Sequence, residues 1–122
     1  GKIILVFGSA GERDAQKRPE MGRAADGLVD LMIITREDNR SEPVEKISQQ
    51  IANGIQAKKL NQDYFIIPDR REAIRFALSK TNKNDIVVVT GKGHEQSLNI
   101  DGREIPWDDR KVLREEIHAA SH

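Results

Sequence analysis

The 122-residue sequence contains no cysteine, which excludes disulfide bonds and thiolate-bound zinc. Its 20 lysine and arginine residues balance 20 aspartate and glutamate residues, so no overall charge attracts nucleic acid or an anionic membrane. The longest apolar runs, such as Ile3–Phe7 and Ile86–Val89, are far shorter than the roughly 20 residues that span a bilayer. Without a signal-peptide pattern either, we expect a soluble cytoplasmic protein with no nucleic-acid or membrane partner.

The length suits one compact domain, residues 1–122. Four short runs rich in β-branched residues predict strands, namely Lys2–Phe7, Leu31–Thr35, Tyr64–Ile67 and Asp85–Thr90. Because these runs are apolar on both faces, they are typical of parallel strands covered by helices on each side. Helical spacing occurs in the segments between them, Pro19–Leu28, Pro43–Gly54 and Arg70–Lys80. The alternation predicts an α/β fold with a doubly wound, mainly parallel sheet.

The C-terminal part breaks this alternation. Asp101 and Gly102 stand between two runs that contain apolar residues, a strong signal for a hairpin turn. The predicted hairpin strands are Ser97–Ile100 and Arg103–Ile105. A last helix is expected from about residue 110 to residue 118, with Asp108 or Asp109 capping its first turn. The chain opens almost directly on a predicted strand, so we expect it to be the last part of a longer polypeptide.

Ligands of open parallel sheets bind beyond the carboxyl ends of the strands, so the loops there are the candidate sites. In the first loop, Gly8–Pro19, two glycines allow close backbone approach, and Arg13, Lys17 and Arg18 can bind phosphate or carboxylate. It is not a Walker A loop, because no Gly-Lys-Ser/Thr follows the glycines, and it lacks the third glycine of the dinucleotide fingerprint. The alternative is a solvated turn with ordinary surface charges.

The second loop, Arg36–Pro43, mixes both signs of charge directly after a strand. Asp38 and Arg40 together offer one partner each for the ammonium and the carboxylate of a zwitterion. The alternative is a simple helix-entry loop, in which Ser41 caps the next helix and Glu42 lies in its first turn.

The third loop, Gly91–Glu95, places glycines on either side of Lys92 and brings His94 and Glu95 to the same end of the sheet. His94 can act as a general base, but a single histidine more often has a structural role, and we predict no catalytic residue in this domain. His94 and the two histidines near the C-terminus lack the spacing of zinc ligands, so no metal site is predicted.

Five ordered sequence blocks span nearly the whole chain. They are Gly8–Asp14 with Lys17-Arg18-Pro19 and Met21-Gly22, Thr35 with Arg40-Ser41-Glu42, Asp69-Arg70 with Glu72-Ala73-Ile74, Gly91–Glu95, and Ile105-Pro106 with Asp108-Asp109-Arg110. Together they resemble the C-terminal domain of the Mur ligases, in particular those that add the third amino acid to UDP-N-acetylmuramoyl-dipeptide. The resemblance implies a Rossmann-like domain that closes over a central ATPase domain and presents an amino acid to an acyl-phosphate.

The resemblance also implies roles for individual residues. The amino acid would be bound by Arg13, Asp38, Asn39, Arg40, Gly91 and Glu95, and the side nearer the nucleotide would carry Glu12, Asp14 and Lys17. It leaves the roles of Lys92 and His94 open. The family's phosphate loop, magnesium ligands and carbamylated lysine belong to the central domain and have no match here. ATP and Mg²⁺ are therefore expected in the full-length ligase, and the isolated domain is expected to be inactive.

One departure concerns the acceptor amino acid. Members of the family that use meso-diaminopimelate usually carry Asp-Asn-Pro-Arg where this chain has Glu37-Asp38-Asn39-Arg40. Arg40 favours a ligand with a second carboxylate, whereas Asp38 favours a cation, so meso-diaminopimelate, lysine and other diamino acids stay open. The main alternative function is a stand-alone Rossmann-type module that binds a nucleotide or an anionic metabolite. A dehydrogenase is disfavoured, because Thr35 replaces the acidic residue expected after the second strand, and a purely structural domain leaves the polar loops unexplained.

Overall fold

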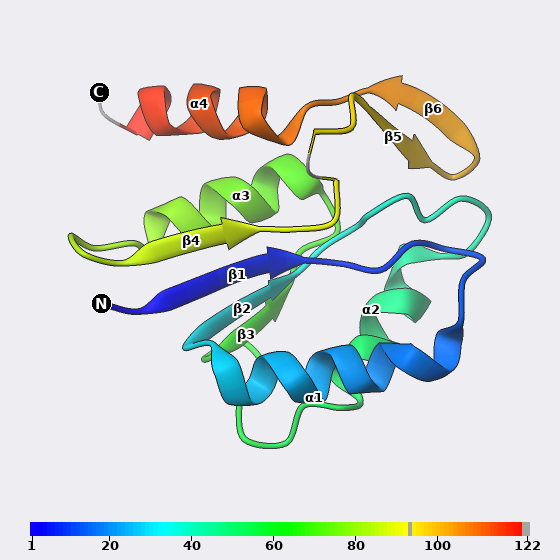
Figure 1. The fold of residues 1–122 in the computed structure, drawn as a ribbon, viewed down its shortest axis with the longest axis horizontal. Coiled ribbons are helices and arrows are strands. Elements are labelled where there is room, and N and C mark those ends of the chain that lie inside the picture. Colours follow the sequence, from blue (N-terminus) through cyan, green and yellow to red (C-terminus); the bar gives the residue numbers. More distant parts are fainter. Residues whose placement is uncertain (93, 121–122) are drawn as a thin grey trace.

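A computed structural model describes residues 1–92 and 94–120 (Figure 1). In chain order the elements are β1 (Ile3–Phe7), the 3-10 helix η1 (Ala15–Lys17), α1 (Arg18–Leu28), β2 (Leu31–Ile34), α2 (Val44–Ala52), β3 (Tyr64–Ile66), α3 (Arg70–Ser79), β4 (Ile86–Val89), β5 (Ser97–Ile100), β6 (Arg103–Pro106) and α4 (Asp109–Ala120). No helix among the described residues is both long and apolar enough to span a membrane. All four predicted strands of the main sheet and all four predicted helices are present.

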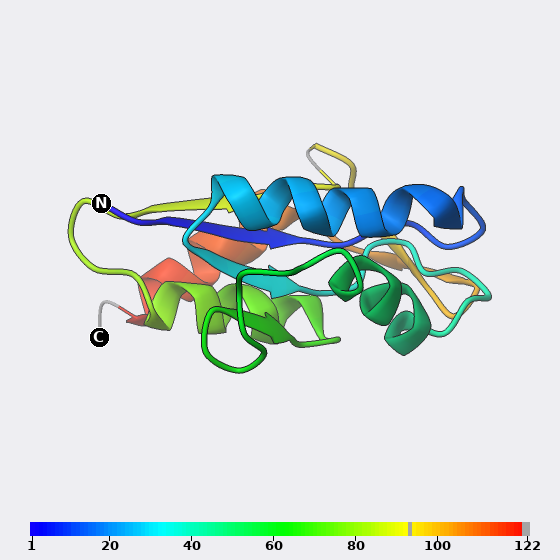
Figure 2. The ribbon, with the colours of Figure 1, turned by 90° about the horizontal axis from the view of Figure 1, so that it is seen from below.

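The main sheet is parallel, with the strand order β3-β2-β1-β4. β1 lies at its centre, where Phe7 pairs with Ile34 on one side and Val6 pairs with Val89 on the other. Helices α1 and α2 cover one face and α3 and α4 cover the other (Figures 1 and 2). This arrangement confirms the predicted α/β fold with helices on both sides of a parallel sheet.

The hydrophobic core consists of two layers, because successive side chains of a strand point to opposite faces. Ile4 and Val6 of β1 pack towards α3 and α4, whereas Phe7 belongs to the layer under α1 and α2. The outer strand β4 departs from the prediction of burial on both faces, since Ile86 is 59% exposed and Val88 is 37% exposed. β4 forms the edge of the sheet, and its exposed side chains do not belong to the layer that packs under α1 and α2.

The helix boundaries follow local capping chemistry. Asp69 caps α3 by accepting a 2.9 Å bond from the amide of Glu72. Pro19 lies in the first turn of α1, as predicted, where a missing amide hydrogen does no harm. The alternative interpretation of the second loop, in which Ser41 caps α2, is wrong on this point, because Pro43 occupies the N-cap position and no side chain caps this helix. Glu42 consequently lies before the helix rather than in its first turn.

The C-terminal hairpin pairs β5 with β6 in antiparallel register as a separate two-stranded sheet. Asp101 and Gly102 both have positive φ angles, 54° and 89°, which a two-residue hairpin turn requires and which this residue pair tolerates. Asp108 accepts a 3.0 Å bond from the amide of Arg110 at the start of α4, so Asp108 rather than Asp109 has the capping role. Asp109 is buried and has a different partner, described below.

Candidate functional site

The three polar loops follow β1, β2 and β4, whose carboxyl ends point to the same side of the molecule (Figure 1). Gly8 and Gly11 of the first loop lie directly against the second loop. A Cβ atom on Gly8 would come within 2.1 Å of the Thr35 carbonyl oxygen, and one on Gly11 within 1.9 Å of the Asn39 carbonyl oxygen. The close backbone approach that these glycines permit is therefore between two loops of the protein itself.

Arg18 joins the same two loops from the buried side. Its side chain is 0% exposed and forms a bidentate pair with Glu42, at 2.9 and 3.0 Å. It also donates to Gln50 Oε1 and to the carbonyl oxygen of Ala10. The hydrogen bonds from Arg18, together with one from the amide of Glu12, lower the pKa of Glu42 to about 2. Arg18, expected to reach an anionic ligand, is instead committed to this internal pair.

Lys92 connects the second and third loops. Its side chain is 1% exposed, and its Nζ lies 3.0 and 2.8 Å from the two carboxylate oxygens of Asp38 and 2.8 Å from Glu95 Oε2. The backbone amide of Asn99, in the hairpin, donates to Asp38 at 2.8 Å. Burial alone would raise the pKa of Asp38, but the bonds from Lys92 and Asn99 outweigh it, so this pKa is lowered. Asp38, predicted to meet a ligand cation, already has an internal one.

Asn39 and Arg40 attach further segments to the second loop. Asn39 is 0% exposed and its Nδ2 donates to the Glu42 carbonyl and to Asp101 Oδ1, both at 2.9 Å. Its Oδ1 has no partner within the described part of the chain. Arg40 has a positive φ of 52°, and its Nη1 donates to the Gly11 carbonyl at 3.0 Å. Of the four residues of the first two loops predicted to bind the amino acid, three, namely Asp38, Asn39 and Arg40, thus carry internal bonds between segments.

Glu37 was given no separate role by the sequence, although it lies in the run aligned with the family motif. Gly91 has a φ of +111°, and a Cβ atom on it would come within 2.7 Å of Glu37 Oε2. Burial raises the pKa of Glu37, and the nearby charges of Asp38 and Glu95 act in the same direction against those of Arg70 and Lys92. The half-buried carboxylate of Glu37 therefore lies beside the third loop. Gly93 of this loop is outside the described residues.

The other predicted residues are on the outside of the loops. Arg13 and His94 are exposed. Glu12 accepts a 3.4 Å bond from the amide of Ser41 in the second loop. Asp14 accepts from the amide of Gln16 and caps η1, which is a local structural role.

Lys17 ends η1 and precedes α1, and it makes no side-chain cap. The three residues expected on the nucleotide side, Glu12, Asp14 and Lys17, therefore lie on one short exposed stretch.

A second buried clamp lies behind the loops and was not foreseen from the sequence. Arg70, whose side chain is 0% exposed, pairs with Asp109 at 2.8 and 2.9 Å. It also donates to the carbonyl oxygens of Arg36 and Thr90, at 2.9 and 3.0 Å. Because these carbonyls follow β2 and β4, one guanidinium fixes the starts of two loops to α4. The only signal in the sequence was that Arg70 and Asp109 both lie in blocks shared with the family.

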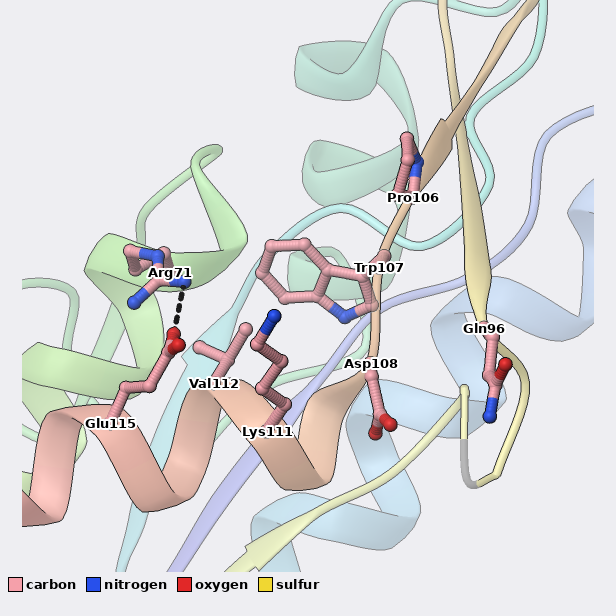
Figure 3. A pocket seen from close by; sticks show the side chains of 8 residues that line it. All are labelled: Arg71, Gln96, Pro106, Trp107, Asp108, Lys111, Val112 and Glu115. Carbon is pink, nitrogen blue, oxygen red and sulfur yellow. Dashed lines mark hydrogen bonds and ion pairs between the residues drawn. The ribbon is translucent and has the colours of Figure 1, made fainter.

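A hollow of about 410 Å³ lies between α3, α4, the end of β6 and Gln96, which directly follows the third loop (Figure 3). Its lining residues are Arg71, Gln96, Pro106, Trp107, Asp108, Lys111, Val112 and Glu115. None of them is a predicted site residue. Within the described ranges 1–92 and 94–120, no group of three or more histidine, aspartate or glutamate residues is placed to hold a metal ion.

Comparisons with known proteins identify the family. The sequence pattern of the family described as Mur ligase, glutamate ligase domain, matches residues 1–93. The chain is 47% identical over 115 residues to a UDP-N-acetylmuramoyl-L-alanyl-D-glutamate--2,6-diaminopimelate ligase of Caldanaerobacter subterraneus, covering 94% of this chain and 23% of the relative. It is 46% identical over 114 residues to a UDP-N-acetylmuramyl-tripeptide synthetase of Treponema denticola, covering 93% of this chain and 21% of the relative.

A solved structure of a UDP-N-acetylmuramoyl-L-alanyl-D-glutamate--2,6-diaminopimelate ligase superposes on the whole chain with a TM-score of 0.91 and 37% identity. The match covers 25% of that chain, so the present chain spans about a quarter of the length of its relatives. The family resemblance inferred from the five sequence blocks is confirmed. The chain belongs to the Mur ligase family and has the fold of its C-terminal domain.

Proposed function

We propose that residues 1–122 form the C-terminal, amino-acid-binding domain of an ATP-dependent ligase that extends UDP-N-acetylmuramoyl-dipeptide by one diamino acid in peptidoglycan synthesis. Relatives named as diaminopimelate ligases and as tripeptide synthetases support this reaction. Membership of the Mur ligase family favours it over a stand-alone module for a nucleotide or an anionic metabolite. The proposed location is the cytoplasm.

The observation that carries the proposal is the direct contact between the second and third loops. Lys92 joins Asp38 to Glu95, while the side chain of Glu95 stays 59% exposed. An exposed carboxylate held in this way can accept a hydrogen bond from an ammonium group, and the guanidinium groups of Arg13 and Arg40 suit carboxylates. An amino acid carries both groups, so the loops offer a partner to each end of such a ligand.

The proposed contribution to the reaction is positioning. Holding an amine against an acyl-phosphate makes the encounter effectively unimolecular, which can supply about 7–11 kcal/mol in well-oriented cases. The described residues contain no cluster of carboxylate and histidine ligands for Mg²⁺, and no Walker A sequence follows β1. We therefore assign ATP and Mg²⁺ mainly to a central domain outside residues 1–122, and expect these residues in isolation to be inactive.

For the acceptor, we propose meso-diaminopimelate first and lysine second. The sequence argument for a ligand cation rested on Asp38, but Lys92 already occupies the two oxygens of that carboxylate. The guanidinium group of Arg40 still favours a ligand with a second carboxylate, as in meso-diaminopimelate. Comparing the ligation rates of the full-length protein with the two amino acids decides between them.

The test uses the full-length protein with Arg40→Ala and Glu95→Ala. We expect each substitution to raise the KM for the amino acid about tenfold or more, since each removes a charged hydrogen-bonding group, and to change the KM for ATP less than about twofold. Arg23→Ala and Glu45→Ala, at exposed positions on α1 and α2, are the matched controls. An unchanged KM for the amino acid in both site variants would refute the proposed binding role.

A further inference from the structure

The hydrogen bonds that the structure gives the Lys92 ammonium group all go to carboxylates of the chain itself. A lysine ammonium has three donors, and the described structure gives it three carboxylate contacts, two with Asp38 and one with Glu95, at 2.8–3.0 Å. Its side chain is 1% exposed. The buried ammonium group of Lys92 is therefore turned to two carboxylates of the protein itself rather than to a phosphate or carboxylate of an incoming substrate.

The partners of Lys92 come from different parts of the chain. Asp38 follows β2, Glu95 follows β4, and Asp38 also holds the hairpin through the amide of Asn99. One buried cation thus ties three segments together. Of these partners, Glu95 is the exposed one: Lys92 holds its Oε2, and the side chain as a whole is 59% exposed.

We propose that Lys92 is a positioning residue for amino-acid binding, whose ammonium group fixes one oxygen of Glu95 so that the other oxygen receives the amine of the incoming amino acid. The inference rests on the proposed function and adds a residue to its site. Lys92 acts through Glu95 and does not touch the substrate itself.

Electrostatics support the same role. Three carboxylates, on Glu37, Asp38 and Glu95, act on one another in this corner, and like charges disfavour simultaneous ionisation. Lys92 counters that repulsion from within, and Arg70 and Arg40 act on Glu37 and on Asp38. A neutral residue in place of Lys92 leaves the three carboxylates with only the charges of Arg70 and Arg40 to counter their repulsion, although the carboxylate that receives an ammonium group must stay ionised.

The experiment replaces Lys92 in the full-length protein. We expect Lys92→Met to raise the KM for the amino acid about tenfold or more, with kcat and the KM for ATP changed less than about threefold. Lys58→Met is the matched control, because Lys58 is also largely buried, at 10% exposed, and pairs with a carboxylate, Asp26, outside the three loops. The control is expected to leave all three kinetic constants unchanged.

A double-mutant cycle separates positioning from a general structural role. If Lys92 acts through Glu95, then Lys92→Met adds less than about twofold to the KM for the amino acid once Glu95→Gln is present.

Each result supports or overturns the inference. The inference is overturned if the KM for the amino acid is unchanged in Lys92→Met, or if Lys92→Met raises this KM equally with and without Glu95→Gln. Raised KM values in Arg40→Ala and Glu95→Ala would still support the proposed function in that case. If Lys92→Met does not fold, as judged by thermal unfolding, Lys92→Arg enters the same cycle. Because arginine retains the charge, it is expected to keep the KM within about threefold, and a tenfold rise would overturn the inference.

Discussion

Replacing Arg70 with methionine tests the clamp behind the loops. In the folded protein this guanidinium is fully buried, pairs with Asp109, and donates to the carbonyls of Arg36 and Thr90. Methionine fills a similar volume without any donor. The substitution leaves Asp109 as a buried carboxylate whose remaining side-chain donor is the indole of Trp107, at 2.6 Å.

The expected loss follows from the burial of the pair. Removing one partner of a buried ion pair destabilises proteins by about 3–5 kcal/mol, because the other charge stays behind without compensation. A domain of this kind has a total free energy of unfolding of about 5–15 kcal/mol, so Arg70→Met removes a large share of it. With a urea dependence of about 1–3 kcal/mol per molar, the unfolding midpoint falls by roughly 1–5 M or unfolding begins without urea.

Urea unfolding of the chain, followed by circular dichroism and by the fluorescence of Trp107, measures this loss. The double variant Arg70→Met with Asp109→Leu is expected to recover part of it, because an apolar pair in place of a buried ion pair is often close to neutral. Lys46→Met is the control, since Lys46 is 57% exposed and pairs with Glu42 at 3.6 Å, and it should cost less than about 1 kcal/mol. A loss below about 1 kcal/mol for Arg70→Met, or full additivity in the double variant, would show that the clamp does not stabilise the fold.

Two further predictions concern the first loop and its partner. Gly11→Ala places a Cβ atom 1.9 Å from the Asn39 carbonyl and is expected to destabilise by about 1–3 kcal/mol, whereas Gly27→Ala, in open space on α1, is expected to stabilise by about 0.5–1 kcal/mol; chemical denaturation compares the two. The pKa of Glu42 is lowered from 4.5 to about 2 by Arg18, so its ionised form contributes stability above about pH 5 that is lost as the pH falls towards 2. The unfolding temperature of Glu42→Gln should therefore fall less over this pH range than that of the unchanged protein, and parallel curves would contradict the assignment.

The sequence predicted most of the backbone because its signals are local. β-Branched runs mark the strands, the residues Asp101 and Gly102 mark the hairpin turn, and Pro19 marks the start of α1. The order of elements then leaves few topologies, since parallel strands need crossover helices. The errors also have local causes: Ser41 is a good capping residue, but Pro43 fixes the chain two residues later and takes the N-cap position.

The partners of the charged side chains were much harder to predict. A sequence shows that Arg18, Asp38 and Lys92 follow strands, where ligands bind, but it does not show which charges meet inside the folded chain. Asp38 and Lys92 are 54 residues apart and Arg18 and Glu42 are 24 apart, so only the sheet order brings each pair together. The charged groups of Arg18 and Asp38, which the sequence offered to a ligand, therefore form internal ion pairs. The side chains of Arg13 and Glu95 are exposed.

The sequence by itself determined the elements, their order, the polar ends of three strands and the likeness to the Mur ligase family, because these depend on residue type, periodicity and spacing. Only the tertiary structure decided which loops touch, which glycines lie in close contact with a neighbouring backbone, and that Lys92 pairs with carboxylates inside the protein. The ion pairs of Lys92 with Asp38 and of Arg18 with Glu42 depend on distances of about 3 Å between atoms far apart in the chain, and those distances exist only once the sheet has formed.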